Sequence, residues 1–124
     1  MTIAALAAST VPAAAAADQI EGSWSGNGTV RLKDGTVEPV RCRVKYENGG
    51  GNQTFVLYAN CATTANTFQQ DGRVVFVGGS RYTGRLYSNQ YDVSGDVTVS
   101  VSGKRQTISV SSPKGSASMT LNKQ

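Results

Sequence analysis

Residues 37–62 read VEPVRCRVKYENGGGNQTFVLYANCA, and this stretch decides the fold. On each side of the glycine-rich centre, apolar and polar residues alternate with a period of two, which is typical of two β-strands joined as a hairpin. Along the first half the even positions from Val40 to Tyr46 are apolar, whereas the odd positions carry Arg41, Arg43 and Lys45. Because basic side chains belong in water, we expect the even face in the core.

Cys42 and Cys61 fit one register of this hairpin. If they lie directly opposite each other, Val44 faces Ala59, and the two-residue sequence Gly51-Asn52 forms the tip. Gly-Asn suits the positive φ angles that a tight hairpin turn requires, and directly opposed residues lie within the Cα separation that a disulfide tolerates. The core face, the turn and the cysteine pair therefore agree on one register.

The first 17 residues, MTIAALAASTVPAAAAA, are uncharged, largely apolar and end in small residues. This pattern is typical of a secretory signal, and we expect cleavage after Ala17, so that residues 18–124 form a single domain. The segment is too short and too weakly apolar to span a bilayer after maturation. The chain contains no His to complete a zinc site, so in an exported protein its two cysteines indicate a disulfide. Closing a loop of about 20 residues would stabilise the fold by about 3 kcal/mol.

Strand patterns continue through the rest of the domain. In the first predicted strand, Ile20, Trp24, Val30 and Leu32 share a face. Beyond the hairpin we expect strands at 67–70, 73–77 and 82–87, a long strand over 91–101 bent at Gly95, and two strands around Ile108 and over 117–121. The sequence therefore predicts an all-β domain of about eight antiparallel strands. An up-and-down barrel is favoured, and a β-sandwich is the alternative, because either architecture hides the strand edges.

Catalytic motifs are absent from the sequence. Nucleophilic catalysis of the usual Ser-His-Asp or Cys-His kind needs a His, and the eight acidic residues are scattered singly along the chain. A pair of carboxylates assembled in space is the remaining catalytic alternative. We predict a protein that is not an enzyme and needs no metal or cofactor.

Three groups of residues are candidate binding sites. Trp24 lies among Gly22, Gly26 and Gly28, which leave a volume for either a neighbouring side chain or a ligand. Aromatic and guanidinium groups alternate at Arg81, Tyr82, Arg85 and Tyr87. Such mixtures bind single-stranded nucleic acid, but export argues against a nucleic-acid partner and leaves a protein interface or an ordinary strand. The third group is the basic face formed by Arg41, Arg43 and Lys45, which is either solvated or binds an anionic polymer.

The segment GSWSGNGTVRLKDGTVEPVRCRVKY, together with NCATTANTF and KRQTISVSSPKGSASMTL, resembles a group of small secreted proteins of alphaproteobacteria, especially of the rhizobial type. The shared pattern is a Gly-x-Trp start, an Asp-Gly turn, an Arg-Cys-Arg strand and a second Cys-Ala. Where members of the group have a second Gly-x-Trp, this chain reads Thr83-Gly84-Arg85-Leu86-Tyr87. The resemblance implies a location in the cell envelope and a disulfide, and it implies no activity.

A weaker likeness, at Gly22-Ser23-Trp24, is to lipocalin- and avidin-like barrels and to periplasmic inhibitors of proteases or lysozymes. Our leading hypothesis from sequence is a periplasmic or secreted, non-catalytic protein that binds an anionic or carbohydrate envelope polymer, or a protein partner, through its outer face. The net charge of +4 permits the former. The alternative is a small-ligand barrel or an inhibitor that uses the rim or the interior around Trp24.

Overall fold

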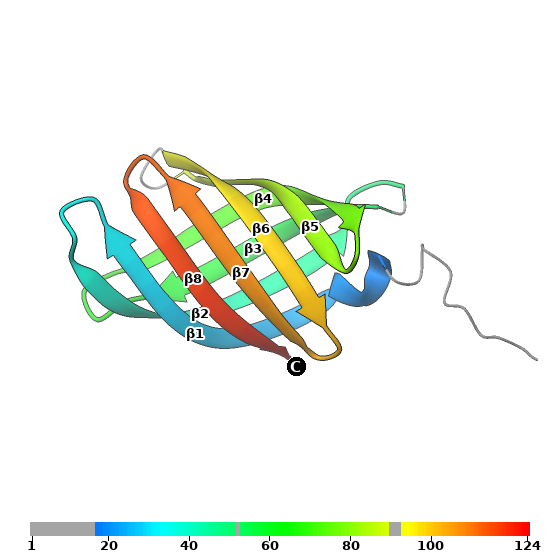
Figure 1. Ribbon diagram of the computed structural model, residues 1–124, viewed down its shortest axis with the longest axis horizontal. Helices are drawn as coiled ribbons and strands as arrows, with labels where there is room; N and C mark the ends of the chain where they lie inside the picture. Colours follow the sequence, from blue (N-terminus) through cyan, green and yellow to red (C-terminus); the bar gives the residue numbers. More distant parts are fainter. Residues whose placement is uncertain (1–16, 52, 90–92) are drawn as a thin grey trace, which may run out of the picture.

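A computed structural model describes residues 17–51, 53–89 and 93–124, which form a closed antiparallel barrel (Figure 1). Each strand pairs with the next along the chain, and the first pairs with the last. The predicted up-and-down barrel is therefore confirmed, and the sandwich alternative is not adopted. A short 3-10 helix, η1 (Asp18–Ile20), precedes the strands β1 (Gly22–Leu32), β2 (Val37–Asn48), β3 (Thr54–Ala62), β4 (Thr67–Gly78), β5 (Arg81–Ser88), β6 (Val93–Ser102), β7 (Arg105–Ser112) and β8 (Gly115–Lys123).

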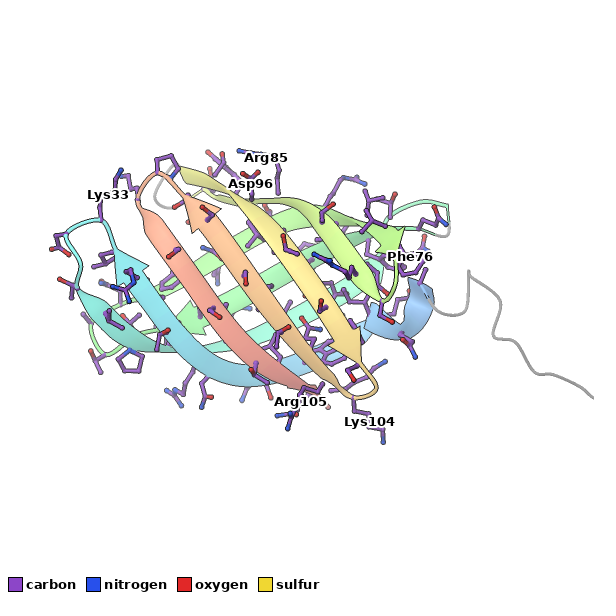
Figure 2. All side chains as sticks on the ribbon, in the orientation of Figure 1. Lys33, Phe76, Arg85, Asp96, Lys104 and Arg105 are labelled. Atoms are coloured by element: carbon purple, nitrogen blue, oxygen red, sulfur yellow. A yellow bond between two sulfur atoms is a disulfide. The ribbon has the colours of Figure 1, made fainter. Side chains whose placement is uncertain are left out.

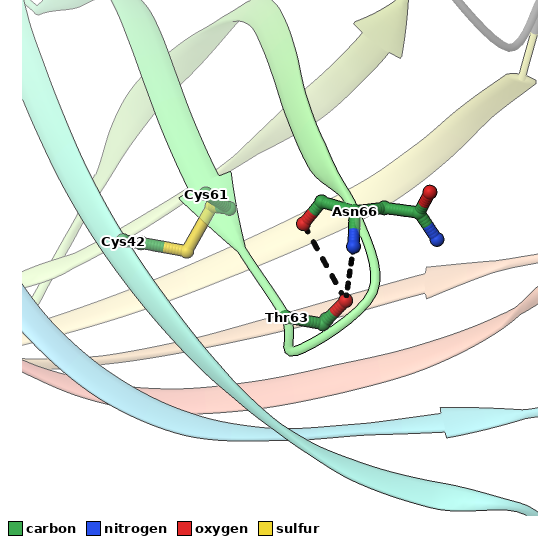
Figure 3. Close-up of a disulfide and its surroundings, with 4 residues drawn as sticks. All are labelled: Cys42, Cys61, Thr63 and Asn66. Atoms are coloured by element: carbon green, nitrogen blue, oxygen red, sulfur yellow. Dashed lines mark hydrogen bonds between the residues drawn. A yellow bond between two sulfur atoms is a disulfide. The ribbon is translucent and has the colours of Figure 1, made fainter.

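The β2–β3 hairpin has the register that the cysteines predict. Cys42 pairs with Cys61 and Val44 with Ala59, and the two sulfur atoms form a disulfide inside the barrel (Figure 3). The bridge lies beside the β3–β4 turn, which is closed by a hydrogen bond from the Thr63 backbone N–H to the Asn66 carbonyl. The predicted disulfide is thus confirmed in its strands, its register and its inward orientation.

The predicted two-residue tip of this hairpin is wrong. β2 ends at Asn48 and β3 begins at Thr54, so the connection spans residues 49–53, of which Asn52 lies outside the described residues. Backbone pairing continues to Gly49, whose N–H donates to the Thr54 carbonyl at 2.8 Å. Beyond it the Asn48 side chain binds the loop backbone, since its Oδ1 accepts from the Gly50 N–H at 2.9 Å and its Nδ2 donates to the Gly51 carbonyl at 2.8 Å. Asn side chains commonly bind nearby backbone groups in this way.

Two further expectations need correction. Ile20, assigned from its parity to the first strand, belongs instead to η1, and its side chain is fully buried. The strands expected at 67–70 and 73–77 are one strand, β4. They join through Gly72, where a Cβ atom would lie 2.0 Å from the Arg85 carbonyl oxygen, so the glycine lets β5 approach closely without interrupting β4. Gly95, where the sequence predicts a bend, lies within β6, and Tyr91 is outside the described residues.

Candidate functional site

One end of the barrel, which we call the closed end, carries η1 and the turns at 49–53, 79–80 and 103–104 (Figure 1). The Trp24 indole Nε1 donates to the Ile20 carbonyl at 2.9 Å, and the Tyr82 hydroxyl donates to the Ala17 carbonyl. Ala17 and Ile20 have no exposed surface. The segment that precedes β1 therefore plugs this end, and the packed domain includes Ala17, while the rest of the expected signal segment lies outside the described residues.

Aromatic side chains fill the barrel behind this plug. The Tyr82 ring packs edge-on against Phe55 with centroids 5.9 Å apart, and against Phe76 at 5.2 Å. The Tyr46 hydroxyl donates to Gln106 Oε1 at 2.8 Å. Burial raises the pKa of Tyr46 well above its usual range, outweighing the opposite effect of this hydrogen bond. The closed end is thus a packed core in which the Tyr46 and Tyr82 hydroxyl groups are paired, while Gln106 Nε2 is buried without a hydrogen-bond partner among the described residues.

Trp24 and Tyr82, two of the candidate binding residues, both lie in this packed end. Their exposed fractions are 1% and 0%, so neither ring is accessible, which corrects their assignment. The backbone of β8 occupies the volume that the glycines around Trp24 leave, since a Cβ at Gly26 would lie 2.1 Å from the Thr120 carbonyl oxygen. The glycines around Trp24 therefore let β8 approach β1 closely, and the space beside them is filled by backbone rather than open to a ligand.

The opposite, open end of the barrel contains a cavity of about 290 Å³, which we call the cup. Its walls are mainly inward-facing side chains from β1, β2, β4, β5, β7 and β8, which are Val30, Glu38, Phe68, Gln70, Ser88, Val110 and Ala117. Leu32, Thr63, Asn66 and Lys114 lie around its rim. Small side chains in part of the wall leave this space: Val30 and Ser88 stand on β1 and β5, the strands that carry Trp24 and Tyr82 at the closed end.

Three of the wall side chains named above are polar: Glu38, Gln70 and Ser88. The Ser88 hydroxyl is buried and donates to the Gln69 carbonyl at 3.2 Å. Glu38 is half-buried, shares the inward parity of Val40 and Cys42, and is the cross-strand partner of Val30. The cup was not expected from the sequence. One feature pointed to it: Glu38 is an acidic residue on the otherwise apolar, even-numbered face of β2.

The basic candidates Arg41, Arg43 and Lys45 lie exposed on the outer face of β2, as predicted. Arg41 and Arg43 line a broad groove of about 710 Å³ across the outside of β1 to β4, together with polar side chains that include Ser25, Asn27, Asn60 and Gln69. Lys45 Nζ instead pairs with Glu47 Oε2 at 3.1 Å. Within the described residues, no carboxylate forms an ion pair with Arg41 or Arg43.

The candidates on β5 divide between the two faces of the strand. Arg81, Arg85 and Tyr87 point outward, opposite to the buried Tyr82. Arg85 Nη1 forms an ion pair with Asp96 Oδ1 at 2.6 Å, and Figure 2 shows these two side chains together on the outer surface. Because β3 and β4 separate β5 from β2, the two basic groups do not form one patch.

Two other kinds of site are absent from the described parts of the chain. No group of three or more acidic, His or Cys side chains is arranged there to hold a metal ion. No helix in these same ranges is long and apolar enough to cross a membrane.

The fold is shared with several solved structures. A redesigned barrel, mFAP1, bound to DFHBI is similar with a TM-score of 0.73 and 13% identity, over 87% of this chain and 98% of that one. A second redesigned barrel, b11L5F_LGL, is similar with a TM-score of 0.70 and 13% identity, over 88% and 95% of the two chains. Rv2717c from M. tuberculosis has a TM-score of 0.57 and 12% identity, over 94% and 99%. No protein-family model matches the chain, and no curated protein is significantly similar in sequence.

Proposed function

We propose that this protein is a non-catalytic barrel that binds a small apolar molecule in the cup at its open end. The cup itself carries the proposal. A concave, mainly apolar site with a few polar groups is the usual form of a small-ligand site, and the mouth of a small barrel is a usual place for one. The solved barrel with DFHBI bound supports the view that a barrel of this shape can hold a ligand.

The size of the cup limits the ligand. A volume of about 290 Å³ holds about ten non-hydrogen atoms at about 30 Å³ for each water-sized group. Val30, Phe68, Val110 and Ala117 provide the apolar wall, and the rim side chains leave the polar end of a ligand in contact with water. We therefore expect short-chain or single-ring molecules, with one polar end, to fit the cup.

Filling the cup tests this proposal. Ala117 faces the cup from β8, and Ala117→Leu places a branched side chain in the cavity. We expect calorimetric titration with n-octanol to show saturable binding to the unmodified protein and at least about tenfold weaker binding to Ala117→Leu, which corresponds to about 1.4 kcal/mol. Ser118→Leu is the matched control, because Ser118 is the next residue of β8 and points outward. Equal binding to both variants would place octanol outside the cup.

The location that we propose is the periplasm or the extracellular medium. The disulfide supports it, because stable disulfides are typical of oxidising compartments. The N-terminal sequence and the resemblance to secreted alphaproteobacterial proteins support it as well. Mass-spectrometric determination of the mature N-terminus after expression in a Gram-negative host would test it, and retention of residues 1–16 in a cytoplasmic fraction would contradict it.

A second candidate function is binding of an anionic or carbohydrate envelope polymer to the outer groove. The observation that favours it is the pair Arg41 and Arg43, which face a groove lined with amide and hydroxyl side chains and lack acidic partners among the described residues. Arg41→Glu together with Arg43→Glu should abolish co-sedimentation with purified cell envelopes and leave octanol binding unchanged. Unaltered sedimentation would exclude this function.

A further inference from the structure

Among the described residues, the inner wall of the cup carries one charged side chain, Glu38. Its position is set by β2, where it lies two residues before Val40 on the face that points into the barrel. Among the described strands, the other charged residue of inward parity is Lys123. That ammonium group is at the closed end, 3.0 Å from the Gln19 carbonyl and above the Trp24 ring. Over the ranges that the structure describes, the inner wall of the open end therefore has a negative charge and no positive one, and Lys114 lies at the rim.

The Glu38 carboxylate has no counter-ion in the described parts of the chain. The two ion pairs found there are Lys45 with Glu47 and Arg85 with Asp96, both on the outer surface. Lys114 also lines the cup, but it lies on the exposed β7–β8 turn and makes no ion pair with Glu38. A carboxylate partly withdrawn from water and held beside apolar groups is stabilised by a cation that donates hydrogen bonds to it.

We propose that the ligand of the cup is a small apolar amine, an inference that rests on the small-ligand function proposed above. The hydrocarbon part would pack against Val30, Val110 and Ala117, and the ammonium group would donate to the Glu38 carboxylate. The Phe68 ring, on the same wall, adds an aromatic face that attracts a cation. The side-chain carbonyl of Gln70 offers a further acceptor inside the cup.

Three probes of equal chain length test the inference: n-octylamine, n-octanol and sodium octanoate, titrated calorimetrically at neutral pH and low salt. We expect octylamine to bind at least about tenfold more tightly than octanol, since a hydrogen bond to a charged group exceeds a neutral one by about this factor. Octanoate should bind most weakly. Glu38→Gln should remove the preference for the amine over the alcohol, because the neutral amide no longer attracts the ammonium group. Glu47→Gln, an equal change of net charge on the outer face of the same strand, should preserve it.

The outcomes separate this inference from the proposed function. Equal binding of octylamine and octanol would overturn the amine inference and leave the cup as an apolar site. Tighter binding of octanoate would also overturn it and would indicate Lys114 as the anchor. If none of the three probes binds, the proposed function itself fails. The ratio of amine to alcohol binding in the unmodified protein decides between these outcomes even if Glu38→Gln does not fold.

Discussion

The two ends of the barrel are built from the same eight strands and differ in the volume of the side chains that point inward. At the closed end these side chains include Trp24, Tyr46, Phe55 and Tyr82, and η1 covers them. At the open end the corresponding positions hold smaller groups such as Ser88, Val110 and Ala117. Because the number of strands sets the width of a barrel, the size of the inward side chains decides which end is core and which is cup.

The two ends also differ in how their polar side chains are partnered. At the closed end the Trp24 indole, the Tyr82 hydroxyl and the Tyr46 hydroxyl each have an intramolecular partner. At the open end Glu38 forms no ion pair within the described residues. Gln106 Nε2 at the closed end also lacks a hydrogen-bond partner among the described residues, but this side chain is fully enclosed, whereas the half-buried Glu38 lines the cup and is available to a ligand. We therefore assign stability to one end and binding to the other.

The largest effect on stability is expected from Trp24→Ala. The indole is 1% exposed and holds η1 through its hydrogen bond to Ile20, so removing it should lower the free energy of unfolding by about 4 kcal/mol. Urea denaturation followed by circular dichroism measures the change. Tyr58→Ala is the control, because this ring is 45% exposed on the outer face and should cost less than about 1 kcal/mol. Similar losses for both variants would contradict a packed closed end.

Removal of the disulfide should have the next largest effect. Cys42→Ala combined with Cys61→Ala should lower the free energy of unfolding by about 3 kcal/mol, because the bridge no longer restricts the unfolded chain. Cys61 pairs across β3 and β4 with Phe68, a wall residue of the cup. Amide hydrogen exchange should therefore accelerate more in the β3–β4 turn than in the turn at 103–104. Free thiols in the purified protein, detected by mass spectrometry, would contradict the structural role of the bridge.

A smaller effect is expected from alkaline pH. Burial raises the pKa of Tyr46 above its usual value of 10.0, so the folded protein keeps this proton at a pH where the unfolded chain loses it. The stabilisation is complete below about pH 10 and is lost above it by up to about 1.4 kcal/mol per pH unit. Tyr46→Phe should reduce the slope of unfolding free energy between about pH 10 and pH 12, whereas Tyr58→Phe at the exposed position should not. Equal slopes in both variants would contradict burial of the Tyr46 hydroxyl.

The fold was predictable from the sequence because its signals are local. Period-2 alternation between Arg41 and Tyr46 gives the inward face, and the cysteine pair gives the register of β2 on β3. The loop at 49–53 was not predictable in the same way, because the Asn48 side chain binds the backbone of Gly50 and Gly51, and alternation gives no signal of such contacts.

The cup was not predictable from alternation alone. Its walls come from β1, β2, β4, β5, β7 and β8, and an inward-facing Val110 or Ala117 reads identically whether the volume in front of it is filled or empty. Which end of the barrel is filled depends on the sum of side-chain volumes across strands distant in sequence. Alternation also does not show whether the volume beside Trp24 is filled. In the structure the β8 backbone fills it, next to the neighbouring glycines.

Methyl-detected NMR during titration with n-octanol tests the contrast between the two ends most directly. We expect saturable chemical-shift changes at the cup methyl groups of Val30, Val110 and Ala117, and unchanged shifts at the closed-end methyl groups of Ile20, Val101 and Leu121. Shift changes at the closed end, or none at the cup under saturating octanol, would contradict a packed end opposite a binding end.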